Sequence, residues 1–325
     1  MSTVVQVTQK LEIPWTLVKG MSNVGAALSP LCWDRRRDRG DTMSALPALE
    51  DDVDGGPQAT AHRPQSLLLS FFGALVLDAG LPPLPSVTLL DLLADLGIAE
   101  AAARATLKRM TQRGLLARGQ VGRTAEYALT PLVQDVLRQA RERVAAPEPF
   151  CHPEGEWTLL SYSVPESRRD LRHRVRARLT WAGFGGLRDG LWIAPGTVDV
   201  AAVLGSSELA DVAGLADAFA AQVLPGTDVH RLVHRAWDVP GIRAAHTRFV
   251  DTWSRPPQVS GSLAQLTLLG ADWLALLRAD PGLPASELGP EWPAPASAAV
   301  YRRVFDGLEP AARAALERSI RAAGR

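Results

Sequence analysis

The segment from Arg104 to Arg123 carries side chains suited to binding a polyanion. No aspartate or glutamate interrupts it. Guanidinium and ammonium groups neutralise phosphates and release counterions when a protein binds a nucleic acid. The whole chain has a formal net charge of zero, so this local excess predicts a polyanion partner for one module of the protein. The basic residues of the segment are Arg104, Lys108, Arg109, Arg113, Arg118 and Arg123.

Arginine content alone is a weak signal in this chain. Only Lys10, Lys19 and Lys108 are lysines among 35 basic residues, and alanine is abundant, which is typical of a coding bias. A solvated basic helix face and a protein-interaction module are therefore the alternatives to DNA binding. The acid-free stretch favours DNA. We predict DNA contacts from the six basic residues and Thr124, with added hydroxyl contacts from Thr106 and Thr111.

A pair of histidines suggests metal binding, which we do not favour. His230 and His234 are four residues apart, so one helical face would present both, with Asp228 and Asp238 nearby. Arg231 follows His230 where a zinc-protease motif requires glutamate. Solvated histidines on a surface helix are the simpler interpretation. The sequence predicts no metal site and no cofactor.

Two further clusters have simpler structural interpretations. The run from Arg168 to Arg178 holds six arginines against Glu166 and Asp170, and we interpret it as a solvated helix face, with phosphate contact to DNA or a CoA 3′-phosphate as the alternative. Cys151 and His152 are adjacent on a proline-rich linker, so their side chains point apart and do not form a nucleophile–base pair. We predict no catalytic residue.

The elements around the first basic segment are predicted in the order of a winged helix-turn-helix. In this fold one helix enters the major groove, the preceding helix braces it, and a hairpin reaches the adjacent backbone. Ala103, Leu107 and Met110 share one face of the third predicted helix, which leaves Arg104, Lys108 and Arg109 on the exposed arc. The predicted elements are helices Ser66–Ala79, Leu89–Leu96 with a Thr88 cap, Glu100–Gln112 and Pro131 to about Val144, and strands Leu115–Arg118 and Ala125–Leu129 around the Gly119–Arg123 turn.

The rest of the chain predicts a second α+β module and a helical end. A β-α-β-β-α-β order beginning at Trp157 is typical of a ferredoxin-like module. Val212–Phe219 stays open between a helix and the fourth strand. The other predicted elements are strand Trp157–Val164, helix Arg168–Trp181, a hairpin around Asp189-Gly190, helix Val198–Leu204, and the C-terminal helices Asp228–Trp237, Pro240–Trp253, Gly261–Ala279 and Ala298–Ala323.

Length and composition bound the remaining possibilities. The chain has 325 residues and 46% hydrophobic content, which predicts two or three domains. It shows neither an apolar run of about 20 residues nor a signal-peptide pattern, and Cys32 and Cys151 cannot build a disulfide framework. We therefore expect a cytoplasmic protein with no membrane association. The predicted domains are 1–62, a disordered arm or a mis-annotated start with Met43 as the real one; 63–147, winged helix-turn-helix; 153–227, ferredoxin-like; and 228–325, helical.

Several segments together resemble the PaaX family of bacterial transcriptional repressors. The resemblance spans about residues 63–312, and the order and spacing of the segments carry it. It implies an α+β protein with an N-terminal winged helix-turn-helix, a central ferredoxin-like (Cas2-like) module and a C-terminal helical domain. The matching segments are Ala103–Leu116, Gly122–Thr130, Leu179–Leu187, Ala236–Val239, Leu283–Trp292 and Tyr301–Val304.

The resemblance also implies a function. It implies a repressor that binds double-stranded DNA, a homodimer, and release by an effector such as phenylacetyl-CoA or another acyl-CoA. Arg104, Arg109 and Arg123 sit where the family places basic residues in the recognition helix and wing. The resemblance places no effector contact on a particular residue, so the effector-binding residues stay unknown.

The middle module is similar to the Cas2 nuclease fold but lacks its catalytic carboxylate. Those nucleases carry an aspartate after a tyrosine at the end of the first strand, whereas Ser163 follows Tyr162 here. A serine does not ligate a hard metal ion as a carboxylate does. We expect a non-catalytic scaffold for dimerisation or effector binding.

The sequence therefore predicts effector-responsive DNA binding and no enzymatic activity. Two other hypotheses remain: an enzyme acting on an acyl-CoA-type metabolite with a vestigial winged helix, and a winged-helix protein-interaction module.

Overall fold

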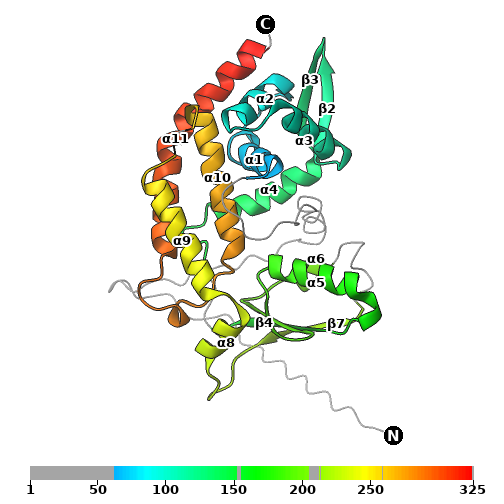
Figure 1. The fold of residues 1–325 in the computed structure, drawn as a ribbon, viewed down its shortest axis with the longest axis vertical. Coiled ribbons are helices and arrows are strands. Elements are labelled where there is room, and N and C mark those ends of the chain that lie inside the picture. The colour runs from blue at the N-terminus through cyan, green and yellow to red at the C-terminus, as the bar shows by residue number, and fades with distance from the viewer. Residues whose placement is uncertain (1–61, 152–154, 205–211, 213, 258, 324–325) are drawn as a thin grey trace, which may run out of the picture. The chain divides into compact units, whose positions relative to one another are not determined.

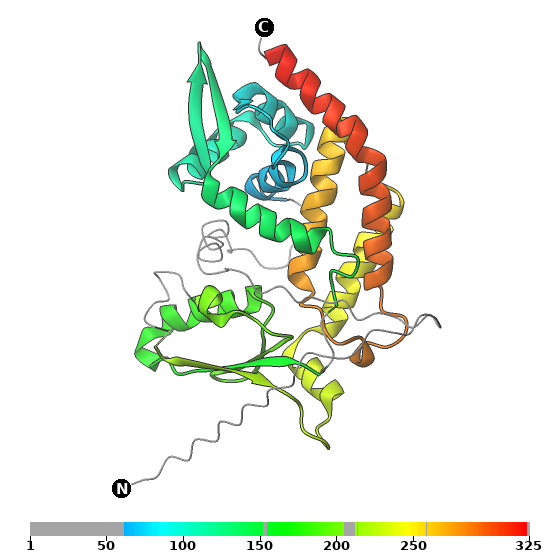
Figure 2. The ribbon, with the colours of Figure 1, turned by 180° about the vertical axis from the view of Figure 1, so that it is seen from behind.

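The computed structural model describes residues 62–151, 155–204, 212, 214–257 and 259–323 (Figures 1 and 2). Apart from His62, the predicted N-terminal arm lies outside the described residues, and so do Cys32, Met43 and His152. The chain contains both helices and strands up to the end of strand β7 (Ala216–Ala221). All the described elements after β7 are helices. The mixed helix-and-sheet composition with a helical C-terminal part agrees with the prediction.

The first predicted helix is two different helices. α1 (Pro64–Phe71) begins with proline at its first position and continues directly as a π-helix, η2 (Phe72–Val76). The backbone N–H of Leu77 donates to the carbonyl oxygen of Phe72, five residues earlier, at 2.8 Å. The prediction of one continuous helix to Ala79 was wrong, because the wider π turn ends the regular pattern at Phe71.

A short strand and a second helix follow. β1 is Leu84–Pro85 and α2 is Ser86–Asp95. The prediction that Thr88 caps this helix was wrong: the helix begins three residues earlier than expected, at Ser86, and Thr88 is a buried residue inside it. The predicted end was nearly right, because Gly97 adopts a φ of 79° just after the helix.

The basic segment lies on helix α3 and on the β-hairpin that follows it in the chain. α3 spans Glu100–Gln112, which are the predicted bounds. β2 (Leu116–Val121) and β3 (Thr124–Leu129) pair antiparallel around Gly122-Arg123, and β1 joins β3 to give the order β1-β3-β2. The strands run past the predicted turn because the hairpin closes on two residues, with Gly122 at a φ of 57°. α4 (Pro131–Val144) follows within the predicted bounds.

The middle segment forms a four-stranded antiparallel sheet with helices on one face (Figure 2). The strands lie in the spatial order β5-β6-β4-β7. Along the chain, the elements follow the predicted β-α-β-β-α-β order. Of the described residues in the segment Val212–Phe219 that the sequence left open, only those from Ala216 onward form a strand, since β7 pairs with β4 along its length and this pairing overrides the helix preference of its alanines. The elements are β4 (Trp157–Tyr162), a 3₁₀ turn η3 (Glu166–Arg168), α5 (Arg169–Trp181), β5 (Gly185–Arg188), β6 (Leu191–Pro195), α6 (Val200–Leu204) and β7.

Within the described residues, four α-helices follow β7. They are α8 (Val229–Ala236), α9 (Val239–Ser254), α10 (Gly261–Ala279) and α11 (Ala294–Ala323), with a 3₁₀ turn η5 (Ala285–Glu287) before the last. α10 and α11 lie side by side in both views (Figures 1 and 2). Among the described residues, no helix has the length and apolar character needed to cross a bilayer.

One hydrophobic core joins the N-terminal elements to the C-terminal helices. Buried residues from α1 to α4 and from α9 to α11 belong to a single cluster, and Phe71, Trp253 and Trp273 are among its largest fully buried side chains. α1 packs closely on α10, where the Ser70 hydroxyl donates to the Thr267 carbonyl oxygen at 2.9 Å. The basic helix α3 therefore packs on a hydrophobic core to which the C-terminal helices also contribute.

Candidate nucleic-acid interface

One face of α3 is buried and the opposite face is basic. Ala103, Leu107 and Met110 are 0%, 2% and 0% exposed, so the predicted apolar face packs into the core. The four- and three-residue spacing of these residues puts Arg104, Lys108 and Arg109 on the exposed face. The basic side chains of α3 are therefore accessible from solvent while its apolar face stays packed in the core.

Thr106 does not have the role that the sequence predicted. It is 1% exposed, and its hydroxyl donates to the Ala102 carbonyl oxygen at 2.9 Å, so a direct DNA contact is excluded by burial. The same hydroxyl oxygen accepts from Nη2 of Arg109 at 3.1 Å. Thr106 therefore positions Arg109. Thr111 is half-buried and donates to the Leu107 carbonyl oxygen at 2.9 Å.

A carboxylate lies beside the basic face, just before the acid-free segment begins. Arg104 donates from Nε and Nη2 to Oε1 of Glu100, at 2.8 and 2.6 Å. Both side chains are more than 60% exposed, so the pair is well solvated. Exposed i,i+4 pairs contribute only about 0.3–0.5 kcal/mol, and a phosphate group can displace Glu100 from Arg104.

Arg113 occupies a different environment from the other predicted contacts. It caps the end of α3, is half-buried, and donates from Nη1 to Oε1 of Gln65 on α1 at 3.2 Å. Its position ties α3 to α1, unlike the exposed side chains along the helix.

The β2–β3 hairpin carries the remaining predicted residues. Arg118 is exposed on β2, and Arg123 is exposed in the two-residue turn at the hairpin tip. Thr124, the first residue of β3, is half-buried and pairs with Val121, which is 63% exposed. The hairpin also holds Glu126, three residues beyond the acid-free segment, at a half-buried position.

The second basic run is only partly a solvated face, which corrects the prediction. Arg178 is 7% exposed and donates from Nε to the Val203 carbonyl oxygen at 2.9 Å, which ties α5 to α6. Arg172 donates to the Val164 carbonyl oxygen at 2.8 Å, and Arg176 pairs with Asp189 in the β5–β6 turn. These arginines hold the module together.

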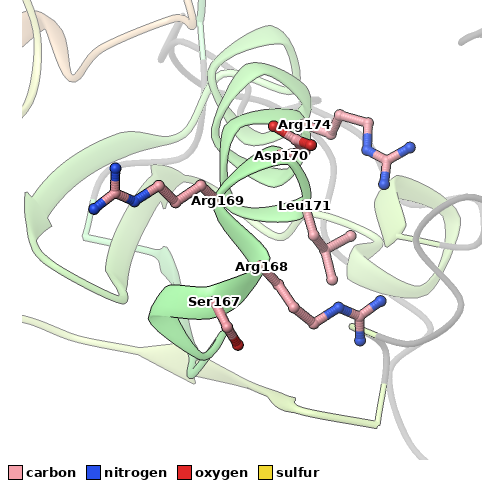
Figure 3. Close-up of a pocket in the computed structure, with 6 residues that line it drawn as sticks. All are labelled: Ser167, Arg168, Arg169, Asp170, Leu171 and Arg174. Atoms are coloured by element: carbon pink, nitrogen blue, oxygen red, sulfur yellow. The ribbon is translucent and has the colours of Figure 1, made fainter.

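The start of α5 leaves an open hollow with basic sides (Figure 3). Arg168 and Arg174 extend to the same side of the helix with Leu171 between them, whereas Arg169 points to the other side. Asp170 lines the same hollow, so its charge is mixed. The hollow shows no enclosed polar group that would define a ligand.

The two aspartates near the histidine pair cap helices. The rings of His230 and His234 lie 4.2 Å apart between centroids. Asp228 caps α8 by accepting from the Arg231 backbone N–H at 2.9 Å, and Asp238 caps α9 by accepting from Gly241 N–H at 3.0 Å. In the part of the chain that the structure describes, no three His, Cys, Asp or Glu side chains gather as a metal site.

A buried serine–histidine–aspartate cluster was not found from the sequence. His246 hydrogen-bonds Ser297 Oγ through Nδ1 at 2.9 Å and Asp280 Oδ2 through Nε2 at 2.8 Å. All three are at most 1% exposed, so no substrate reaches them. Arg143 of α4 donates to the Asp280 carbonyl oxygen at 3.0 Å. The cluster is a structural link between α4, α9, α10 and α11, and no local pattern marks it because its members are far apart in sequence.

The structure places Tyr162 and Ser163 at the end of β4. Tyr162 ends the strand and is 7% exposed, and Ser163 follows it as an exposed residue. A carboxylate is therefore missing at the position where Cas2 nucleases hold one.

Comparisons with known proteins identify two matching family models. Residues 63–132 match a model described as a PaaX-like protein, and residues 152–233 match the PaaX protein central Cas2-like domain. A solved structure, the uncharacterized protein Rv0674 from Mycobacterium tuberculosis, is similar in fold. It has 24% sequence identity and a TM-score of 0.50, over 81% of this chain and 99% of that chain. Among curated proteins, none matches this chain.

Proposed function

The chain belongs to the PaaX family, and from that premise we propose that it is a DNA-binding transcription regulator, a repressor that acts as a homodimer. The observation that carries the proposal is the exposed basic face of α3, whose opposite face is fixed in the core. We assign segment 63–147 to a winged helix-turn-helix, 153–227 to a ferredoxin-like module and 228–325 to a helical domain.

In this proposal α3 is the recognition helix and the β2–β3 hairpin is the wing. Arg104, Lys108 and Arg109 contact DNA from the helix, where the major groove offers a distinct pattern of donors and acceptors at each base pair. Arg118, Arg123 and Thr124 contact the adjacent backbone. Arg113 acts at the end of the helix, where its bond to Gln65 restrains it.

A small effector, an acyl-CoA such as phenylacetyl-CoA, releases the repressor from its operator. The effector must bind the DNA-free and DNA-bound geometries unequally, because a ligand with equal affinity for both shifts no equilibrium. A tenfold loss of operator affinity requires about 1.4 kcal/mol of coupling. We propose no catalytic activity. The serine–histidine–aspartate cluster around His246 is closed to solvent and contributes none.

DNA binding is tested by fluorescence anisotropy on a duplex from the region upstream of the gene. We expect Arg109→Ala to weaken binding about tenfold or more, because one good side-chain–base pair contributes about 1–3 kcal/mol. Arg318→Ala is the control, since Arg318 is an exposed arginine on α11. Equal binding by wild type and Arg109→Ala would remove α3 from the interface.

A further inference from the structure

An apolar cavity of about 360 Å³ lies in the shared core, between the N-terminal elements and the C-terminal helices. α1, η2 and α4 line one side, and α10 and α11 line the other. Protein interiors are close-packed and leave few voids larger than a water molecule. This space is instead a pocket partly open to solvent, with mostly apolar walls, and it is large enough to admit a small ligand. Its walls include Gly73, Ala74, Leu137, Ala140, Trp273 and Tyr301.

The cavity coincides with the irregular part of the backbone. Gly73 and Ala74 belong to the π-helix η2, and Asp78 just after it has a φ of 58°, which is uncommon outside glycine. Arg141 of α4 supports this segment from its Nη2, which donates to the Gly73 and Leu77 carbonyl oxygens at 3.1 and 2.8 Å. π-turns are frequent at functional sites, and here the turn forms one wall of the cavity.

The wall opposite is rigid and aromatic. The rings of Trp273 and Tyr301 are stacked, with centroids 4.3 Å apart and an interplanar angle of 9°. Burial, and to a lesser degree the charge of Asp306, raises the pKa of the Tyr301 phenol, so the side chain stays neutral. A flat, neutral wall of this kind fits a planar ring or an alkyl chain.

The size of the cavity sets the size of the apolar group. A cavity of about 150 Å³ already holds benzene. The volume of about 360 Å³ therefore accommodates a phenyl ring together with a short chain.

The charged residues at the cavity favour an acidic or carbonyl group on the ligand. Arg141 and Arg302 line it together with one aspartate, Asp306. Arg141 is already paired with Asp78 at 3.2 Å. Arg302 is exposed and donates to the Pro147 carbonyl oxygen at 3.0 Å, and no described carboxylate pairs with it. Arg302 is therefore the cation that remains for a ligand.

We propose that this cavity binds the apolar group of a small organic acid, as the free acid or as its thioester, with Arg302 at the carboxylate or carbonyl. The proposal rests on the proposed function, because it makes the cavity the effector site. It places the effector beside the DNA-binding elements and not in the middle module. A ligand seated there changes how α1 and α4 pack on α10 and α11, and thereby how α3 is held.

Ligand binding is measured by calorimetry on the full chain without DNA. The probes are phenylacetate, phenylacetyl-CoA, CoA alone and the neutral phenylacetamide. We expect one of the first two to bind at least tenfold more tightly than both CoA and the amide, and the stronger of the two identifies the source of the ligand. The proposal would be overturned if neither phenylacetate nor phenylacetyl-CoA bound more tightly than both CoA and the amide.

Two variants locate the site. Ala140→Phe fills the cavity from α4 and is expected to lower the affinity at least tenfold, whereas Ala311→Phe adds the same ring at an exposed position of α11 and leaves binding unchanged. Arg302→Gln changes an exposed residue, so the fold is retained if Ala140→Phe does not fold. We expect it to weaken the acid or thioester at least fivefold and not the amide. Wild-type affinity in both folded variants would contradict the proposal.

The design separates this inference from the proposed function. Operator binding by the unliganded chain tests the proposed function alone. A chain that binds its operator but takes up neither acyl probe refutes only the cavity proposal. A chain that binds the thioester in an Ala140-dependent manner and fails to bind DNA refutes only the regulator.

Discussion

At the scale of single residues, α3 combines exposed cations with side chains that position them. Thr106 holds Arg109 by a hydrogen bond, and Glu100 holds Arg104 by an ion pair. Neither role depends on DNA. The bond to Thr106 restricts where the Arg109 guanidinium points before any ligand arrives, which reduces the entropy lost on binding. The exposed pair with Glu100 instead competes with any anion that Arg104 binds.

Glu100→Gln tests whether Arg104 meets phosphate. Removing the carboxylate leaves Arg104 uncompensated, so we expect DNA affinity to rise roughly two- to fivefold at low salt, given that exposed pairs contribute about 0.2–1 kcal/mol. The control is Glu317→Gln, which removes the exposed partner of Arg321 on α11. Anisotropy titrations measure the change, and an unchanged or lower affinity for Glu100→Gln would place Arg104 away from DNA.

Residue periodicity predicted the orientation of α3, but not every contact on it. Ala103, Leu107 and Met110 repeat at helical spacing, and this identifies the buried face without any structure. Thr106 lies at the edge of that face, and only the packing of α3 on its neighbours decides that it is buried. Glu100 was missed because the acid-free segment begins at Arg104, one helical turn later.

At the scale of elements, two features depended on partners that the sequence does not show. The π-helix η2 follows an apolar run that resembles an ordinary helix, and Arg141, more than sixty residues away, supports its carbonyl groups. β7 is rich in alanine, and its pairing with β4 makes it a strand. The hairpins were predictable because Gly122 and Gly190 mark their turns locally.

The close approach of α1 and α10 gives a prediction for stability. A Cβ at Gly270 would lie 2.4 Å from Ser70 Oγ, so Gly270→Ala forces the hydroxyl away from Thr267. We expect a loss of about 1–3 kcal/mol in the free energy of unfolding. In a Ser70→Ala background the next atom, Ser70 Cβ, is 3.7 Å away, and the same change should stabilise by up to about 1 kcal/mol, because alanine is favoured over glycine inside a helix. Urea unfolding of the four proteins measures the coupling, and simple additivity would refute this contact.

The contact between the middle sheet and α8 gives a second prediction for stability. A Cβ at Gly185 would lie 2.7 Å from the Ala236 carbonyl oxygen and 2.7 Å from the Trp237 ring. Gly185→Ala should therefore lower stability by about 1–3 kcal/mol. Gly186→Ala is the control, because its Cβ would meet the Trp192 ring at an ordinary 3.8 Å. Thermal unfolding compares the two, and equal melting temperatures would mean that this interface is loose.

At the scale of the whole molecule, one shared core joins the proposed DNA-binding elements to the C-terminal helices. Phe71 of α1 and Trp273 of α10 lie in the same buried cluster. α1 packs on both α3 and α10, so α1 connects the basic helix directly to the C-terminal helices. This gives a physical route from an effector to the operator.

The proposed homodimer has a geometric consequence. Two recognition helices related by a two-fold axis lie about one DNA turn apart, near 34 Å, and protect two half-sites of an inverted repeat. Hydroxyl-radical footprinting on the upstream region should show two protected segments with that spacing, and sedimentation should give a dimer. A single protected segment bound by a monomer would refute the dimer.

The dependence of operator affinity on salt tests the central claim most directly. The claim is that the exposed face of α3 binds DNA phosphates and bases. For wild type and for the double variant Lys108→Ala/Arg109→Ala, the logarithm of the affinity is plotted against the logarithm of salt concentration. Each lost phosphate contact lowers the slope by about 0.9, so we predict a weaker complex whose slope is smaller by up to about 1.8. An unchanged slope and affinity in the folded variant would contradict the account.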